Sequence, residues 1–346
     1  MNDRLRALWD FGNLDASETR LRGQLESETS DAGRAEVLTQ LARVEGLRDR
    51  FEAGERLVVE AEQLAGASEV ARARIDLERG RLRRSSGDPQ AAFPLFESAF
   101  TTALPAGQTF IAADAAHMAA LAAGNREGFL RWTNRGIDLA EEDGDAFYWL
   151  GPLLNNLGWE LYEAAAYEAA LNAFERALVA RERNPENPEP IALARFAVGK
   201  ALRAVGRHEE AIPLLEQAVA WTTAVGQPDG WYHEELAEEY AAAGRADDAR
   251  AQALLALPLL VETDPAFADD VTRADRLRAL AAASPGHAAW RDAYDARSTA
   301  SASSRSTSEV RTANVASTGS GDARSTPAVR RRSSGYPDPP ARRKSR

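Results

Sequence analysis

The sequence contains no cysteine among its 346 residues. This absence excludes disulfide bridges, thiolate metal sites and a cysteine nucleophile. Long apolar runs are missing as well, because no stretch approaches the roughly 18–20 residues that a membrane-spanning helix needs. The opening MNDRLRALWDFG carries charges where a signal peptide requires an apolar core. We therefore expect a cytoplasmic protein with no membrane partner.

Aromatic residues make up only 7% of the chain, and runs of β-branched residues of the kind that form strands are nearly absent. Much of the 44% hydrophobic fraction is alanine. Alanine, leucine, glutamate and arginine lose little side-chain freedom in a helix, so their abundance favours helical structure. The composition predicts an all-α protein.

Lysine is also scarce, since Lys200 is the only lysine before residue 297. Residues 297–346 carry 11 basic and three acidic side chains, a net charge of +8. Residues 1–296 carry 31 basic and 50 acidic side chains, a net charge of −19. An acidic body disfavours nucleic acid as a partner, because the phosphate backbone requires positive surface.

A pattern of small residues recurs along the chain at a nearly constant spacing. It is clearest in LLNNLGWELYEAAAYEAALNAFERAL (153–178) and returns in FAVGKALRAVGRHEEAIPLLEQAV (196–219) and HEELAEEYAAAGRADDARAQALLAL (233–257). The separations between successive copies are 38, 37, 41, 41 and 38 residues. The copies are marked by Ala42, Gly80, His117, Gly158, Gly199 and Ala237, and the third copy is degenerate because His117 stands where a small residue is expected.

The clearest copy resembles the tetratricopeptide repeat family, whose repeat has a signature of Leu-Gly, Tyr, Ala, Phe and Ala. The matching residues are Leu157, Gly158, Tyr167, Ala170, Phe174 and Ala177. The resemblance implies a right-handed α-solenoid in which each repeat is a pair of antiparallel helices. The opening ALWDFGNLDASETRLR in addition resembles the start of some uncharacterised bacterial tetratricopeptide proteins.

Four regions follow from this reading. Residues 1–34 are expected to form an N-terminal capping segment, with Asp15 capping a helix that ends near Ser27. Residues 35–263 are expected to form six helix pairs, and residues 264–296 two capping helices, the second with Trp290 and Tyr294. Residues 297–346 are rich in Ser, Thr, Arg and Pro without apolar periodicity, so we expect a disordered basic tail.

Catalytic and cofactor motifs are incomplete. His233 and Glu234 begin like a zinc-protease motif, but Ala237 occupies the place of the second histidine. Gly199 and Lys200 resemble the end of a phosphate-binding loop whose other required residues are missing. We therefore expect a protein that is not an enzyme and that holds no metal or cofactor.

The family resemblance places four positions of each first helix in a binding groove. Basic residues beside an aromatic centre would suit an extended peptide with acidic residues or a free carboxylate. The asparagine amides could hold the backbone of such a peptide. The candidate groove residues are Arg43, Arg81, Arg84, Asn155, Asn156, Trp159, Tyr162, Lys200, Arg203, Trp231, Glu234 and Glu238.

Two interpretations of these residues stay open at this point. The aromatic side chains can bind a partner or pack between repeats, and the arginines can meet a ligand or pair with acids of the same chain. The leading function is a scaffold that binds a protein or peptide segment in the groove. The alternatives are a self-assembling helical-repeat protein, hence a homo-oligomer, and a sensor scaffold regulated by its own basic tail.

Overall fold

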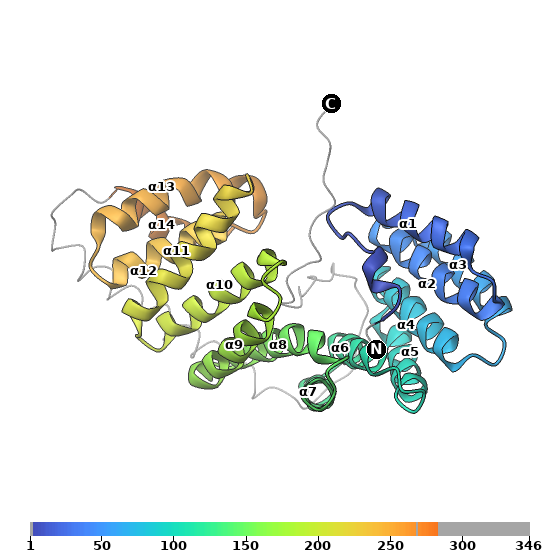
Figure 1. Cartoon of the computed structure of the whole chain (residues 1–346). Helices are drawn as coiled ribbons and strands as arrows, with labels where there is room; N and C mark the ends of the chain where they lie inside the picture. The colour runs from blue at the N-terminus through green and yellow to red at the C-terminus, as the bar shows by residue number, and fades with distance from the viewer. Residues whose placement is uncertain (1–2, 268, 283–346) are drawn as a thin grey trace, which may run out of the picture. The chain divides into compact units, whose positions relative to one another are not determined.

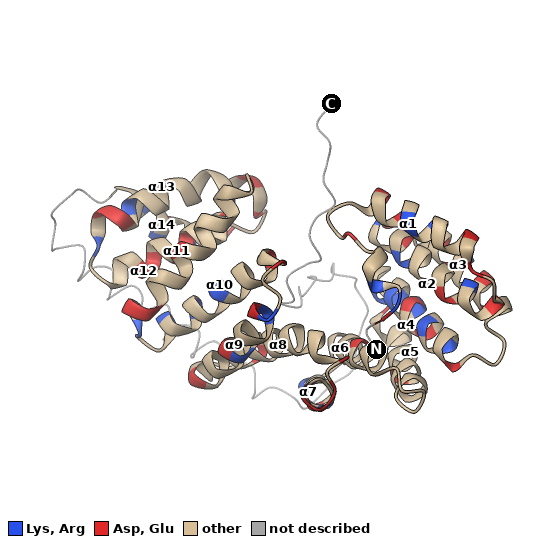
Figure 2. Cartoon of the chain, viewed as in Figure 1, with Lys and Arg blue, Asp and Glu red and all other residues tan. Residues whose placement is uncertain are grey.

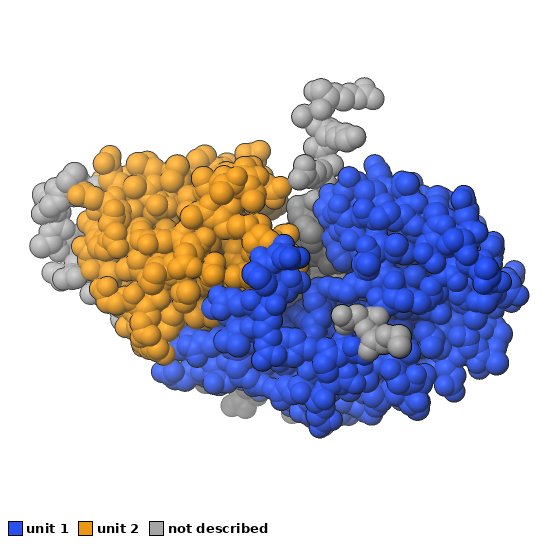
Figure 3. Space-filling view, viewed as in Figure 1, with its two compact units in different colours: residues 1–186, 336–346 blue, residues 187–335 orange. Residues whose placement is uncertain are grey.

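The computed structural model describes residues 3–267 and 269–282, and all regular structure among them is helical. The predicted capping helix with Trp290 and Tyr294 and the predicted tail lie outside these residues. The chain divides into two compact units (Figure 3), the first ending at Glu186 and the second beginning at Asn187. Each unit is described by itself.

Unit 1 contains a short 3₁₀ turn followed by nine α-helices and a second 3₁₀ turn (Figure 1). Their bounds are η1 Arg6–Leu8, α1 Leu14–Ser27, α2 Asp31–Leu47, α3 Phe51–Ala65, α4 Glu69–Ser85, α5 Pro89–Ala103, α6 Thr109–Ala122, α7 Arg126–Glu142, η2 Phe147–Trp149, α8 Leu150–Glu163 and α9 Tyr167–Glu182. Helix α1 packs on α2, and the remaining helices pack as α2 with α3, α4 with α5, α6 with α7 and α8 with α9.

Unit 2 contains five helices in the described residues. Their bounds are α10 Pro188–Ala204, α11 His208–Ala224, α12 Gly230–Ala242, α13 Ala246–Thr263 and α14 Val271–Ala282. Helix α10 packs with α11, α12 with α13, and α14 covers α13. The predicted all-α architecture of six helix pairs is thus confirmed. We call α2, α4, α6, α8, α10 and α12 the first helices, and their partners the second helices.

Local sequence signals explain where the helices begin and end. Asp88 accepts a hydrogen bond from the Ala91 amide over 3.0 Å, and Pro89 opens α5. The predicted cap at Asp15 is wrong, because the Asn13 side chain accepts the Ala16 amide at 3.0 Å and the cap therefore lies two residues earlier. Gly206 has φ +78° between α10 and α11, the left-handed conformation that closes a helix.

The small residues of the repeat signature lie where paired helices touch. A Cβ atom built on Gly158 of α8 would lie 2.4–2.8 Å from ring carbons of Phe174 on α9. Gly80 stands in the same relation to Phe96, and Gly199 to Leu215. The three large side chains are fully buried. In repeats two, four and five the first helix can therefore approach its second helix this closely only because glycine has no side chain.

Candidate functional site

Ion pairs join the first helices of repeats one to three in unit 1. The side chain of Arg74 on α4 is only 4% exposed and donates to Glu36 of α2 over 3.1 Å. Arg81 of α4 lies 2.6 Å from Glu78 of the same helix and also binds Asp114 of α6. Glu78 and Asp114 are buried as well. Buried charges are costly unless paired, so these contacts lock the three helices to one another.

Among the predicted groove residues of unit 1, Arg43 and Arg81 join this network. Arg43 of α2 lies 4.0 Å from Glu78, and its guanidinium lies over the rings of Trp9 and Phe11 at 5.4 and 5.3 Å from their centroids. Arg84 is half-buried in the last turn of α4. Arg43 thus faces both an acid and aromatic rings of the same chain, and Arg81 faces two acids.

The predicted aromatic centre lies on α8. Trp159 packs edge-on against Phe174 at a centroid distance of 5.1 Å and against Tyr162 at 5.8 Å, and both predicted residues are half-buried. Asn156 Nδ2 lies 3.0 Å from His117 Nε2 on α6. Asn155 is buried, and its Oδ1 has no hydrogen-bond partner within the described part of the chain. This cluster therefore joins repeats three and four.

Unit 2 carries a second network, centred on α12. Lys200 Nζ of α10 lies 2.6 Å from Glu235, which Arg203 also binds. Burial by itself raises the pKa of Glu235, but the charges of Arg203 and Lys200 outweigh it and hold the pKa at about 2. The carboxylate is therefore ionised at neutral pH. Both predicted groove cations of repeat five consequently bridge to the next repeat.

The predicted groove residues of repeat six face α14. Arg273 donates to Glu234 at 2.7 Å, and Arg276 binds Glu238. Trp231 is 41% exposed, and the Arg273 guanidinium lies over its ring at 3.9 Å. Glu234 and Glu238 are buried. The predicted acidic end of the groove thus holds the last helix of the described chain.

Most of these charged contacts have a similar sequence separation between their two partners. They join residues 32 to 39 positions apart, which is about one repeat. Figure 2 shows the acidic and basic residues along α4 and α12 from which these contacts come. Sequence reasoning identified the basic positions but missed their partners, which an alignment of each helix with the following one would have found.

The residues before α1 form a feature that the sequence analysis missed. Residues 3–13, here called the N-terminal segment, cross the faces of α2, α4 and α6 that carry the ion pairs. Asp3 accepts from Arg74, the indole N–H of Trp9 donates to Gln40 Oε1 at 3.0 Å, and Arg6 lies 5.3 Å from the ring centroid of Phe110. This face of the three helices is called the groove face of unit 1.

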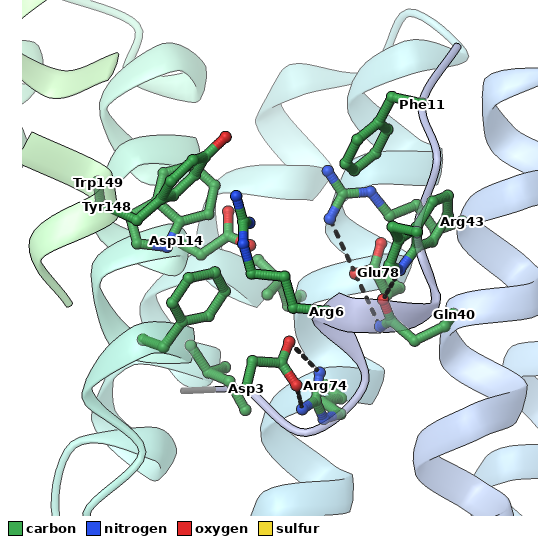
Figure 4. Close-up of a pocket in the computed structure, with 14 residues that line it drawn as sticks. Asp3, Arg6, Phe11, Gln40, Arg43, Arg74, Glu78, Asp114, Tyr148 and Trp149 are labelled. Atoms are coloured by element: carbon green, nitrogen blue, oxygen red, sulfur yellow. Dashed lines mark hydrogen bonds and ion pairs between the residues drawn. The ribbon is translucent and has the colours of Figure 1, made fainter. Parts of the chain in front are cut away.

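A shallow pocket remains beside the N-terminal segment (Figure 4). Arg6 extends into it and lies over the ring of Tyr148 at 3.6 Å, with Arg43 and Phe11 on the opposite side. Phe11 is 45% and Tyr148 40% exposed. The pocket is thus lined by guanidinium groups and by two exposed aromatic rings.

Glu239 provides a pH-dependent element of unit 2. Its carboxylate is fully buried beside His208 Nδ1 at 2.8 Å, with Arg203 and Glu235 also nearby. Burial raises the pKa of Glu239 from 4.5 to about 6, against the opposing effect of His208. Ionised Glu239 therefore destabilises the folded state, so its contribution is most favourable below pH 4.5 and is lost as the pH rises through 6.

We expect Glu239→Gln to raise the free energy of unfolding at pH 8 by on the order of 1–2 kcal/mol. The amide keeps an acceptor for His208 but removes the buried charge. Urea unfolding at pH 8 and pH 5 measures the effect, which should be much smaller at pH 5. A gain of equal size at both pH values would contradict the assignment.

Residues 3–267 and 269–282 contain no group of three or more His, Asp or Glu side chains arranged to hold a metal ion. Within the same residues, every helix is too short or too polar to cross a membrane.

Comparison with known proteins addresses the fold. No family model matches the chain, and no curated protein matches it. The apo form of RapI is similar in structure with a TM-score of 0.59 and 12% identity, over 77% of this chain and 76% of that one. A signal-transduction ATPase with numerous domains from Pyrococcus horikoshii, which carries a tetratricopeptide repeat sensor, gives a TM-score of 0.57 and 16% identity, over 75% of this chain and 41% of that one. The helix pairs, the close glycine contacts and these similarities together show that the chain has the tetratricopeptide-repeat fold.

Proposed function

We propose that this chain is a non-catalytic scaffold that binds a segment of a partner protein on the faces of its first helices. The observation that carries the proposal is a set of exposed aromatic rings, each with an arginine over it. Phe11 with Arg43 and Tyr148 with Arg6 lie on unit 1, and Trp231 lies under Arg273 on unit 2. Tryptophan, tyrosine and arginine are the residues that dominate binding energy at protein interfaces.

The chemistry of the partner follows from these side chains. The Arg6 guanidinium stacked on Tyr148 presents N–H donors at its edge, and these match the oxygens of a carboxylate. The N–H groups of Arg273, in contrast, already bind Glu234 and Asp264. The ring supplies apolar area beside it. The preferred partner segment therefore has an acidic residue next to an apolar one. Further acidic residues in the partner would be repelled by the many other acids of this chain.

We expect Trp231→Ala to shorten the lifetime of a partner complex captured on the immobilised chain. Truncating a central aromatic residue typically costs about 2 kcal/mol or more of binding energy, which corresponds to about 30-fold. Val179→Ala is the matched control, because Val179 is 59% exposed on α9, a second helix that carries none of the proposed contacts. Dissociation rates that are equal for Trp231→Ala and the control would exclude the proposed surface of unit 2.

Lys200 and Arg203 are poor probes of the same surface. Replacing them with glutamate would place negative charge beside Glu235, which is 4% exposed in its side chain. Like charges at a buried site are strongly destabilising, so a loss of binding would report damage to unit 2 rather than contact with a ligand. Arg6 and Trp231 avoid this difficulty because neither holds a buried acid.

Self-assembly is a second candidate, favoured by an apolar row on α13. Leu254, Leu255 and Val261 are 51%, 50% and 69% exposed, so three large apolar side chains of this helix meet solvent. Light scattering of the purified chain across concentrations separates the two functions. A monomer at all concentrations supports the scaffold, and a defined oligomer supports assembly through this row.

A further inference from the structure

The N-terminal segment is held as a bound peptide would be held. Asp3 and Arg74 are 9% and 4% exposed in their side chains, and the Arg74 guanidinium donates two hydrogen bonds to the Asp3 carboxylate. Burial raises the pKa of Asp3, but the charge of Arg74 together with the hydrogen bonds from Arg74 and the Leu5 amide outweighs it, so that the pKa is lowered. The guanidinium of Arg74 thus binds one carboxylate through two hydrogen bonds. Such a bidentate pair contributes binding energy and also fixes the orientation of the acidic side chain.

Three further side chains of the segment enter the groove face of unit 1. Leu5 is 1% exposed and belongs to the same apolar cluster as Leu38 of α2. The Trp9 indole donates to Gln40, and the Arg6 guanidinium stacks on Tyr148. An acid, a leucine, an arginine and a tryptophan therefore each meet a separate receptor on the first three repeats and η2.

The segment is not required to close the end of the helix array. Helix α1 already packs along α2 and covers that end. The segment instead crosses α2, α4 and α6, and its only regular structure is the three-residue turn η1. The segment is thus attached through individual side chains, each of which binds a separate site on the helices. A groove recognises a short peptide in the same way.

We propose that the groove face of unit 1 is a peptide-binding site whose intramolecular occupant is the N-terminal segment. The ligands it takes are segments with the same chemistry, namely an acidic residue for Arg74, a leucine two positions later, then an arginine and a tryptophan. This inference rests on the proposed scaffold function and adds its regulation. A tethered segment competes at an effective concentration of about millimolar, so an external peptide binds when it displaces residues 3–13 and takes the place of Arg6 on Tyr148 and of Phe11 under Arg43.

A pair of variants of the full chain tests the proposal. The probe is a fluorescently labelled synthetic peptide of residues 1–13, followed by fluorescence anisotropy. Asp3→Ala weakens the tethered segment but leaves the groove intact, so the peptide should bind at least about tenfold more tightly than to the unchanged chain. Arg74→Ala removes the same ion pair from the groove side. This change weakens the tethered segment and the added peptide alike, so the peptide should bind no better than to the unchanged chain.

The opposite direction of the two effects is the decisive result. If the segment were only a structural element, both variants would lose stability alike and neither would bind the peptide. Equal binding to both variants would also overturn the proposal, because Arg74 would then not read the acid. Trp9→Ala and Gln40→Ala repeat the comparison at a half-buried contact, should the loss of the buried pair unfold unit 1.

The same variants separate this inference from the proposed function. If a protein partner is captured by the unchanged chain while the peptide binds no variant, the scaffold function stands and the intramolecular occupant is excluded. If the peptide binds Asp3→Ala as expected and no partner is captured, the site exists while the broader function lacks support. An Asp3→Ala chain should also capture more of any partner that uses this groove.

Discussion

Gly158→Ala is expected to lower the free energy of unfolding of the chain by about 1–3 kcal/mol, the usual cost of overpacking a core. The added methyl group would lie 2.4 Å from a ring carbon of Phe174, which is fully buried and enclosed. Alanine otherwise favours a helix over glycine by about 0.5–1 kcal/mol. A decrease in stability would therefore have to come from the contact between α8 and α9, because the intrinsic helix preference acts in the opposite direction. Urea unfolding followed by circular dichroism measures it.

The matched control is Gly23→Ala on α1. A Cβ atom at Gly23 would meet no atom within 4 Å, so the change should stabilise the chain by about 0.5–1 kcal/mol. Combining Gly158→Ala with Phe174→Leu should recover part of the loss, because the two residues are in direct contact. Effects of the same sign at Gly158 and Gly23 would show that the register of the fourth repeat is wrong.

The parts of the fold that repeat locally could be predicted from sequence. The small residue at Gly158 and the bulky one at Phe174 recur at fixed spacing, because every repeat solves the same packing problem. Ala165 shows the limit of such signals, since it takes the left-handed conformation with φ +57° that Gly206 supplies in the next repeat. A turn forced by its neighbours leaves no composition signal.

The candidate site was harder to predict because its contacts join different repeats. Lys200 and Arg203 were identified as basic residues on the ligand side, yet their charge is matched by Glu235 on the next first helix. Counting charges on one helix cannot show this pairing. The N-terminal segment was missed for a different reason: Asp3 and Trp9 belong to no periodic pattern, and their partners Arg74 and Gln40 lie 71 and 31 positions away.

Glu235→Gln is expected to lower the free energy of unfolding at pH 7 by about 3 kcal/mol, in the range seen when one partner of a buried ion pair is removed. Lys200 and Arg203 would keep their charges beside a neutral amide that attracts them far less. The pKa of Glu235 provides an independent estimate. A decrease from 4.5 in the unfolded chain to about 2 in the folded one corresponds to about 3 kcal/mol.

The dependence on pH distinguishes this explanation from a packing defect. Because the folded pKa is the lower one, the ionised carboxylate stabilises the fold fully above pH 4.5, and this stability is lost as the pH falls towards 2. The cost of Glu235→Gln should therefore shrink to about 1 kcal/mol at pH 3. Asp247→Asn, at an exposed position of α13, should change stability by less than about 0.5 kcal/mol. Urea titrations at pH 7 and pH 3 measure both variants, and a cost of Glu235→Gln that stays constant with pH would mean that the loss arises from shape rather than from charge.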